Sequence, residues 1–289
     1  MRPMTPDDLY AITWLSDCAI SPDGATVAFV QTRMDREEDT YRSAIWVVPT
    51  DGSAAARQFT AGAKRDTAPR FSPDGRFLAF LSERGEEKPQ LFVIPTDGGE
   101  ARQLTKLPFG AGAPVWSPDS TKIAFSAKAG TPPDPDTKKA KPFRRIASLK
   151  YKLNAEGFTY DRRAHIFVVE PATDAEPVQL TDGDWSDTQP AWSPDGSVIA
   201  FASARHEERE FDTLSDIFVV AAGGGDARQL TATSGGCSAP SWSPDALTVG
   251  YYFRAQRIAN SVPWACNADG SNHRPLDPAF DRAPAGALR

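Results

Sequence analysis

Pro190-Ala-Trp-Ser-Pro-Asp-Gly196 is one copy of a phrase that this chain uses five times. The other copies are Cys18-Ala-Ile-Ser-Pro-Asp-Gly24, Pro69-Arg-Phe-Ser-Pro-Asp-Gly75, Pro114-Val-Trp-Ser-Pro-Asp-Ser120 and Pro240-Ser-Trp-Ser-Pro-Asp-Ala246. They stand about 45 to 50 residues apart, except for an interval of about 76 after Pro114. A fixed period of this length, with several strands in each unit, is typical of a propeller or a solenoid.

Each repeat can be divided into strands and turns. In Ser-Pro-Asp-Gly, the proline presets φ, the aspartate bonds nearby backbone, and the glycine takes a positive φ. A short apolar strand follows, and then a second one such as Leu91-Phe-Val-Ile94, which shows no polar alternation. Both faces of such a strand are expected to be covered. A Gly-rich turn and a weaker Gln-Leu-Thr strand close each repeat, in degenerate form in the last copy, which ends at Asp277.

These patterns predict an all-β fold, a β-propeller of four-stranded antiparallel blades with about five blades visible. A β-sandwich also has many short strands, but it would not repeat one turn at a fixed period. A β-solenoid would need a shorter period. We therefore expect one propeller domain over residues 1–289, with repeats at about 12–60, 61–105, 106–181, 182–231 and 232–277.

The number of blades in the complete ring stays open at this point. The residues after Asp277 contain no sixth set of strands, and a closed ring of five blades is physically possible. The alternative, which we favour, is that the chain is the first part of a larger propeller.

Composition excludes several classes of protein. The net charge is −6, which does not favour nucleic acid as a partner. No apolar run approaches the length of a membrane helix, so no membrane partner is expected. The N-terminus has acids at Asp7 and Asp8 and no apolar core, unlike a secretory signal. The three cysteines form neither a disulfide framework nor a metal motif, so we expect a cytoplasmic protein with no metal and no cofactor.

A basic insertion at residues 128–163 lengthens the third repeat. It carries ten Lys and Arg residues against four Asp and Glu, in a chain that is otherwise acidic. Its first part is rich in Pro and Lys and cannot build a core. Its second part has apolar residues that could form an extra hairpin or a short helix: Ile146, Leu149, Tyr151 and Leu153.

The topology of a blade predicts which loops share a face. In an antiparallel blade, the loops between the second and third strands all emerge on one face of the disc. Here these loops are long and charged, at residues 33–42, 82–89, 128–163 and 204–215. Binding residues concentrate on long loops held by a rigid scaffold, so this face is the expected interaction face.

The chain shows no recognisable active site. Gly-x-Ser-x-Gly, the nucleophile elbow of the α/β-hydrolases, does not occur. Only His165, His206 and His273 could serve as a general base, and a structural or solvated role is expected for each. We therefore predict no catalytic residue in this chain.

Longer stretches carry a family resemblance. The opening DLYAITWLSDCAISPDGATVAFV, the strands IWVVPTDG and LFVIPTDGGEARQLT, and RRIASLKYKLNAEGF before HIFVVEP resemble the N-terminal propeller of the prolyl oligopeptidase family. The acylaminoacyl-peptidase branch of these serine peptidases is the most similar. The Ser-Pro-Asp-Gly phrase alone is less specific, because TolB-type and other WD40-like β-propeller repeats share it. The turn glycine is replaced at Ser120 and Ala246, and Cys18 stands where other repeats have proline.

The resemblance implies a function for the chain. In this family a seven-bladed propeller caps a C-terminal α/β-hydrolase domain that holds the Ser, Asp and His triad, and it admits only short peptides. We expect that domain to be absent from this chain and to be its partner in the parent enzyme. The chain is then a non-catalytic propeller of a serine peptidase that gates and positions short peptides. The resemblance leaves open whether the chain forms homo-oligomers.

Two arginines of the insertion are candidate substrate-binding residues. Some family members use propeller residues to hold a terminus of the peptide, and a free carboxylate suits a bidentate arginine. Arg144 and Arg145 stand just before the apolar part of the insertion. The alternatives are a solvated basic loop or a contact with the hydrolase domain.

A second function belongs to a different class. The chain could be a stand-alone TolB-like or WD40-like propeller that acts as a scaffold for protein interaction. TolB-type proteins are exported, whereas the start of this sequence does not resemble a signal, so a cytoplasmic adaptor is the form of this alternative that we retain.

Overall fold

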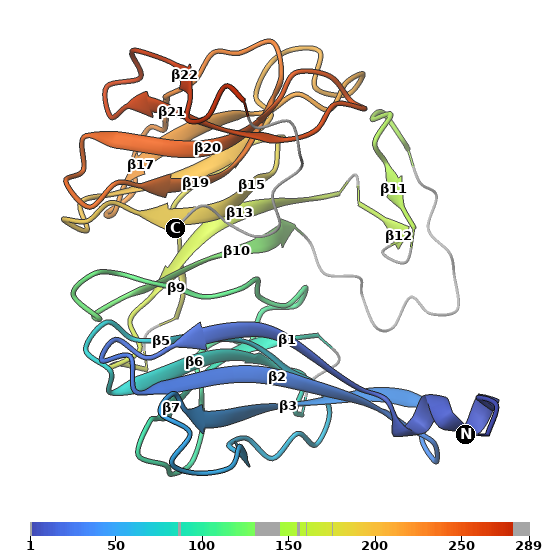
Figure 1. The fold of residues 1–289 in the computed structure, drawn as a ribbon. Coiled ribbons are helices and arrows are strands. Elements are labelled where there is room, and N and C mark those ends of the chain that lie inside the picture. The colour runs from blue at the N-terminus through green and yellow to red at the C-terminus, as the bar shows by residue number, and fades with distance from the viewer. Residues whose placement is uncertain are drawn as a thin grey trace. The chain divides into compact units, whose positions relative to one another are not determined.

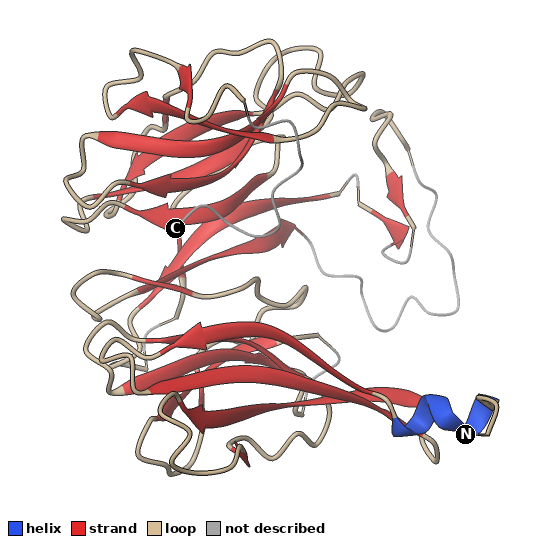
Figure 2. Cartoon of the chain, viewed as in Figure 1, coloured by secondary structure: helices blue, strands red, loops and turns tan. Residues whose placement is uncertain are grey.

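The computed structural model describes residues 2–85, 88–130, 145–154, 157–159, 161–174 and 176–279. The regular structure of these residues is nearly all strand, and the one helix among them is the short 3-10 helix η1 (Pro6–Ala11) (Figure 2). No helix in the described ranges is long and apolar enough to cross a membrane. Internal contacts divide the chain into unit 1 (Met1–Ile123 and Val169–Pro177) and unit 2 (Ala124–Val168 and Val178–Arg289).

Unit 1 contains two four-stranded antiparallel sheets, one for each of the first two repeats (Figure 1). The first consists of β1 (Thr13–Ile20), β2 (Thr26–Asp35), β3 (Thr40–Pro49) and β4 (Arg57–Gln58). The second consists of β5 (Asp66–Phe71), β6 (Phe77–Ser82), β7 (Gln90–Pro95) and β8 (Arg102–Gln103). One buried apolar cluster joins the two sheets and is made of Ala28, Ile45, Val47, Leu78, Phe80, Phe92 and Ile94.

Unit 2 is organised in the same way by the last two repeats. One sheet consists of β15 (Asp187–Trp192), β16 (Val198–Ser203), β17 (Asp216–Ala221) and β18 (Arg228–Gln229). The other consists of β19 (Gly236–Trp242), β20 (Thr248–Arg254), β21 (Val262–Asn267) and β22 (Arg274–Pro275). Their shared core is made of Ala200, Ala202, Ile217, Val219, Leu230, Cys237, Val249, Tyr251 and Cys266.

The third repeat supplies β9 (Val115–Trp116), β10 (Ile123–Gly130), β13 (Arg162–Val169) and β14 (Val178–Gln179), in the sheet order β14-β13-β10-β9. The boundary between the two units falls within this repeat. Between β10 and β13 the insertion forms a separate hairpin of β11 (Lys152–Leu153) and β12 (Gly157–Phe158). The sequence left a hairpin or a helix open, and the structure has the hairpin. All five repeats form the predicted four-stranded sheet, which confirms the fold class.

The repeated turn is held by its own side chains. In every copy the serine hydroxyl donates to the aspartate at 2.5 or 2.6 Å. The same hydroxyl accepts the backbone N–H five residues later. The fourth position has a positive φ throughout, including 63° at Ser120 and 59° at Ala246. A residue with a Cβ is strained there by about 1–2 kcal/mol, so the turns at Ser120 and Ala246 carry a conformational strain that glycine would avoid.

The threonine after the fourth strand explains why Gln-Leu-Thr recurs. The fourth strand is only two residues long, and the threonine hydroxyl then accepts a third-strand N–H, as from Leu91 to Thr105 at 2.9 Å and from Ile217 to Thr231 at 2.9 Å. The equivalent third-strand residue of the last repeat is Pro263, which has no N–H to donate. Threonine has no such role there, and Asp277 takes its place.

The sequence reading of residues 33–42 as a long loop is wrong. β2 continues to Asp35, which pairs in register with Thr40, so only a tight turn remains. Asp35 accepts the N–H groups of Glu37 and Glu38, and Arg42 donates to it at 2.6 Å. These contacts of Asp35 hold the segment as an extended hairpin.

Candidate functional site

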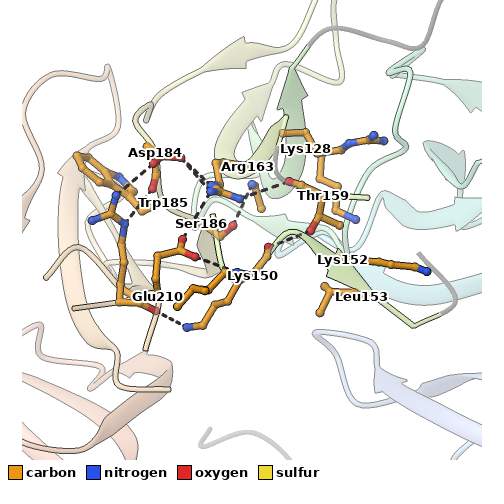
Figure 3. Close-up of a pocket in the computed structure, with 15 residues that line it drawn as sticks. Lys128, Lys150, Lys152, Leu153, Thr159, Arg163, Asp184, Trp185, Ser186 and Glu210 are labelled. Carbon is orange, nitrogen blue, oxygen red and sulfur yellow. Dashed lines mark hydrogen bonds and ion pairs between the residues drawn. The ribbon is translucent and has the colours of Figure 1, made fainter. Parts of the chain in front are cut away.

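A pocket of about 440 Å³ opens within unit 2, beside the hairpin of the insertion (Figure 3). The insertion, the residues that precede β15 and the loop after β16 contribute its walls. The lining residues are Lys128, Leu149, Lys150, Lys152, Leu153, Thr159, Arg162, Arg163, Ala164, Asp184, Trp185, Ser186, Ala204, Arg209 and Glu210. Blade topology predicted that the insertion and the 204–215 loop emerge on one face, and their contacts confirm that they meet.

Glu210 fastens the loop after β16 to the insertion. Its carboxylate accepts the Ser148 hydroxyl at 2.7 Å and the backbone N–H of Lys150 at 2.9 Å. The side-chain ammonium of Lys150 in turn donates hydrogen bonds to the backbone carbonyls of Arg209 and Asp212. The N–H of Lys150 lowers the pKa of Glu210, although burial opposes the shift, and Ser148 and Arg163 add to it. The carboxylate is therefore ionised at neutral pH.

Asp184 accepts hydrogen bonds from two arginines of the lining. Arg163 Nε donates to Asp184 Oδ1 at 3.0 Å, and another of its nitrogens donates to the Thr159 carbonyl at 3.3 Å (Figure 3). Arg209 bonds both the Asp184 carboxylate, at 3.2 Å, and its backbone carbonyl, at 3.1 Å. Arg163 also lies 3.8 Å from Glu210. The arginines thus link the insertion to the residues before β15 and to the loop after β16.

A buried ion pair supports the wall that Trp185 forms. Arg205 donates to both carboxylate oxygens of Asp187 at 3.1 Å, and Asp187 is fully buried. The guanidinium carbon of Arg205 lies 5.0 Å from the centre of the Trp185 ring, a cation–π distance. His165 Nδ1 is 3.4 Å from the same carboxylate. The indole N–H of Trp185 is buried and finds no partner among the described residues.

The pocket combines positive charge with apolar surface. Six of its lining residues are Lys or Arg and two are Asp or Glu, while Leu149, Leu153 and Trp185 contribute apolar surface. Such a site can attract an anionic group and hold an apolar one beside it. Within the described ranges no group of three or more His, Cys, Asp and Glu side chains could hold a metal ion.

The predicted substrate-binding arginines are not tested by this site. Arg144 lies outside the described residues, and Arg145 is exposed and is not among the lining residues. All three histidines have partners: His165 has Asp187, His206 has Asp212 at 2.9 Å, and His273 has the Tyr251 hydroxyl at 3.0 Å.

Sequence reasoning missed the contribution of the residues before β15 to the pocket. Asp184 and Trp185 lie outside every loop that the sequence assigned to the interaction face. One signal was present in the sequence. The acidic run that includes Glu210 is complementary in charge to the basic insertion, and the two segments follow the second strands of adjacent repeats.

Comparisons with known proteins agree with this structure. Residues 15–134 match the family described as TolB beta propeller domain. The chain is 34% identical over 223 residues, which is 75% of its length and 34% of the relative, to a Bacillus subtilis protein named uncharacterized peptidase YuxL. It is 27% identical over 263 residues, 84% of this chain and 37% of the relative, to dipeptidyl-peptidase 5 of Porphyromonas endodontalis.

A solved structure supports the same fold. The acylaminoacyl peptidase of Pyrococcus horikoshii aligns with a TM-score of 0.71 and 18% identity, over 96% of this chain and 41% of that one. The chain spans about a third of the length of the curated relatives it matches. These findings support the resemblance that the sequence carried: residues 15–134 match the TolB propeller domain, and the chain is similar to part of proteins named as peptidases.

Proposed function

We propose that the chain is the non-catalytic propeller of a serine peptidase, which gates the entry of short peptides and helps to position them for a hydrolase domain. The similarity to YuxL, over 75% of this chain but 34% of that protein, carries the proposal. The pocket in unit 2 adds support, because its charged and apolar walls suit a peptide.

The proposed mechanism rests on the rigidity of the blades. Third strands such as β7 and β17 are buried along most of their length, so the loops they carry have a fixed base. Glu210, Arg163 and Lys150 then fix the insertion against the neighbouring loop. Substrate-binding loops on a rigid scaffold can exclude large substrates by shape while they orient small ones.

The test compares this chain with the product of the same reading frame extended past Arg289. The substrates are a chromogenic acyl-amino-acid, a series of peptides of increasing length, and a folded protein. We expect the chain alone to give no turnover. The extended protein should cleave short peptides, lose activity on treatment with a serine-directed reagent, and leave the folded protein intact. A stop codon followed by an unrelated gene, or equal cleavage of short peptides and folded protein, would refute the proposal.

The match to the TolB domain favours a second candidate, a propeller scaffold for protein interaction. Under this alternative, the product of the complete reading frame would cleave no peptide and would instead form a stable complex with another protein. The same activity assay, combined with size-exclusion chromatography of the natural complex, separates the two functions.

We also propose a cytoplasmic location for the protein. Its three cysteines are all free, and Cys18 is exposed, which suits a reducing compartment. Fractionation of cells with an antibody against this chain tests the proposal, and recovery in the exported fraction would contradict it.

A further inference from the structure

The hairpin of β11 and β12 is attached to unit 2 in a different way at each of its two ends. Beyond β12 the chain continues into β13, which lies between β10 and β14 in a four-stranded sheet. Before β11, Ser148 and Lys150 form hydrogen bonds with the loop after β16. A substitution in that loop can therefore release the first end of the hairpin, whereas the second end stays in the sheet.

The hairpin has little structure of its own to hold it in place. Its ladder consists of two residue pairs, Lys152 with Phe158 and Leu153 with Gly157. Leu149 and Leu153 are 62% and 53% exposed, so these apolar side chains contribute little packing. A short two-stranded hairpin is at best marginally stable in water. The position of this hairpin therefore depends on the contacts at its ends.

Glu210 makes the contact at the first end. Its Oε2 atom accepts both the Ser148 hydroxyl at 2.7 Å and the Lys150 N–H at 2.9 Å. The Lys150 ammonium donates to the backbone carbonyl of Arg209, the residue before Glu210. Hydrogen bonds to an ionised acceptor are stronger than those between neutral groups. One carboxylate oxygen thus fastens the segment that precedes β11.

The same contact influences the width of the pocket. Leu149, Lys150 and Leu153 of the insertion line it together with Trp185 and Glu210 (Figure 3). Glu210 belongs to the lining and also binds the insertion, so it joins two walls of the pocket directly. Without this contact the first end of the hairpin could move away, and we expect the pocket of about 440 Å³ to become wider.

From this arrangement we infer that Glu210 is a positioning residue that limits the length of the peptides that the propeller admits. It acts through the hairpin: a bound hairpin keeps the pocket narrow, and a released hairpin lets longer peptides enter. The inference rests on the proposed function, because it names the residue of this chain that sets the size limit.

Hydrogen exchange on this chain measures the attachment of the hairpin. Glu210→Ala should speed exchange in residues 148–154 about tenfold or more, because two hydrogen bonds to a charged group are lost. Glu210→Gln should have a smaller effect, since its amide oxygen can still accept from Ser148 and Lys150. Glu207→Ala removes an exposed acid of the same loop outside the lining, and this matched control should change nothing. Equal exchange in β17 of all three variants confirms that the blade is folded.

Cleavage by the protein extended past Arg289 measures the size limit. For peptides longer than those the parent protein cleaves well, Glu210→Ala should raise kcat/KM about tenfold through a lower KM. For the short chromogenic substrate, kcat should stay within about twofold, whereas general damage to the fold would lower activity on both substrates. Ser148→Ala should act in the same direction but more weakly. Adding it to Glu210→Ala should change little, because the two residues share one contact.

Two results would overturn the inference. One is exchange in residues 148–154 that is as slow in Glu210→Ala as in Glu207→Ala. The other is faster exchange combined with an unchanged limit on peptide length. Failure of the proposed function would look different: the extended parent protein would cleave no peptide, and the exchange measurement would still decide whether Glu210 holds the hairpin.

Discussion

Repeats 2 and 4 contain the same buried ion pair at the same place in the blade and a pocket beside it, but in repeat 4 a tryptophan that lines the pocket also covers the arginine of the pair. In repeat 2, Arg84 reaches Asp66 at 2.9 Å and lies 5.2 Å from the rings of Phe80 and Phe92. In repeat 4 the equivalent residues are Arg205, Asp187, Phe201 and Phe218. Serines at equivalent positions, Ser82 and Ser203, accept from each arginine. The scaffold is therefore the same in both repeats.

The difference lies two residues before the aspartate. Repeat 2 has Lys64 at this position and repeat 4 has Trp185, whose ring covers Arg205 and lines the pocket. Room for the indole comes from Gly183, where a Cβ would lie 2.4 Å from the ring. The comparison shows that both repeats keep the contacts that hold a blade together, and that a few variable positions at the loop ends give each pocket different walls.

The largest expected effect comes from removing either arginine. Arg205→Met leaves the fully buried Asp187 without its charge partner, which should lower the free energy of unfolding by about 3–5 kcal/mol. Arg84→Met should cost less, about 1–3 kcal/mol, because the Arg84 side chain is 30% exposed and water can reach the pair. Urea unfolding followed by tryptophan fluorescence measures both. The exposed Arg102→Met is the control, within about 0.5 kcal/mol of the parent. Equal losses at Arg84 and Arg205 would break the comparison.

A smaller effect is expected at Trp185, where the two repeats differ. Trp185→Phe keeps a ring over Arg205 and removes an indole N–H that is buried and has no partner in the part of the chain that the structure describes. We expect the free energy of unfolding to rise by about 1–2 kcal/mol. In the matched variant Trp242→Phe, the lost N–H donates to the Ala191 carbonyl at 3.2 Å, so stability should fall. If both variants lose stability to the same degree, the N–H of Trp185 has a partner in solution.

Substitutions in the Ser-Pro-Asp-Gly turns test a feature that repeats 2 and 4 share. Gly75 and Gly196 have φ values of 71° and 70°, so Gly75→Ala and Gly196→Ala should each cost about 1 kcal/mol. Ala246 adopts the same conformation in repeat 5 at the same cost, and Ala246→Gly should raise stability by about 1 kcal/mol. Thermal melting of the three variants provides the measurement. A loss of stability in Ala246→Gly would show that strain at this position is relieved elsewhere.

The smallest effect on stability is expected from lowering the pH. The Ser193 hydroxyl and the Ser197 N–H lower the pKa of Asp195 to about 2, and the pKa of Asp74 in repeat 2 is also lowered, against the effect of burial. Because these carboxyls have a lower pKa in the folded state, their stabilisation is complete above the unfolded value and is lost as pH falls from about 4 towards 2. Melting temperature measured against pH should show this decline, and Asp195→Asn should flatten it. A decline that begins near pH 6 would point to other groups.

Much of the fold could be predicted from the sequence because its determinants are local. Turn residues such as Pro194 and Gly196 act within a few residues of themselves, and an apolar run such as Ile217–Val220 indicates burial on both faces. The degenerate last repeat also has a local cause, since Pro263 removes the N–H that threonine accepts elsewhere. The second part of the insertion was more ambiguous, because its apolar residues suit a hairpin as well as a helix.

The sequence by itself therefore determined the repeat, the four strands of each blade and the resemblance to peptidase propellers. Only the tertiary structure decided where a ligand could bind. The contacts of Glu210 with Lys150 and of Arg163 with Asp184 join segments that are 60 and 21 residues apart, and no local pattern reports which distant charges will meet. Local chemistry fixes turns and strands, whereas a site depends on which loop ends the packing of neighbouring sheets brings together.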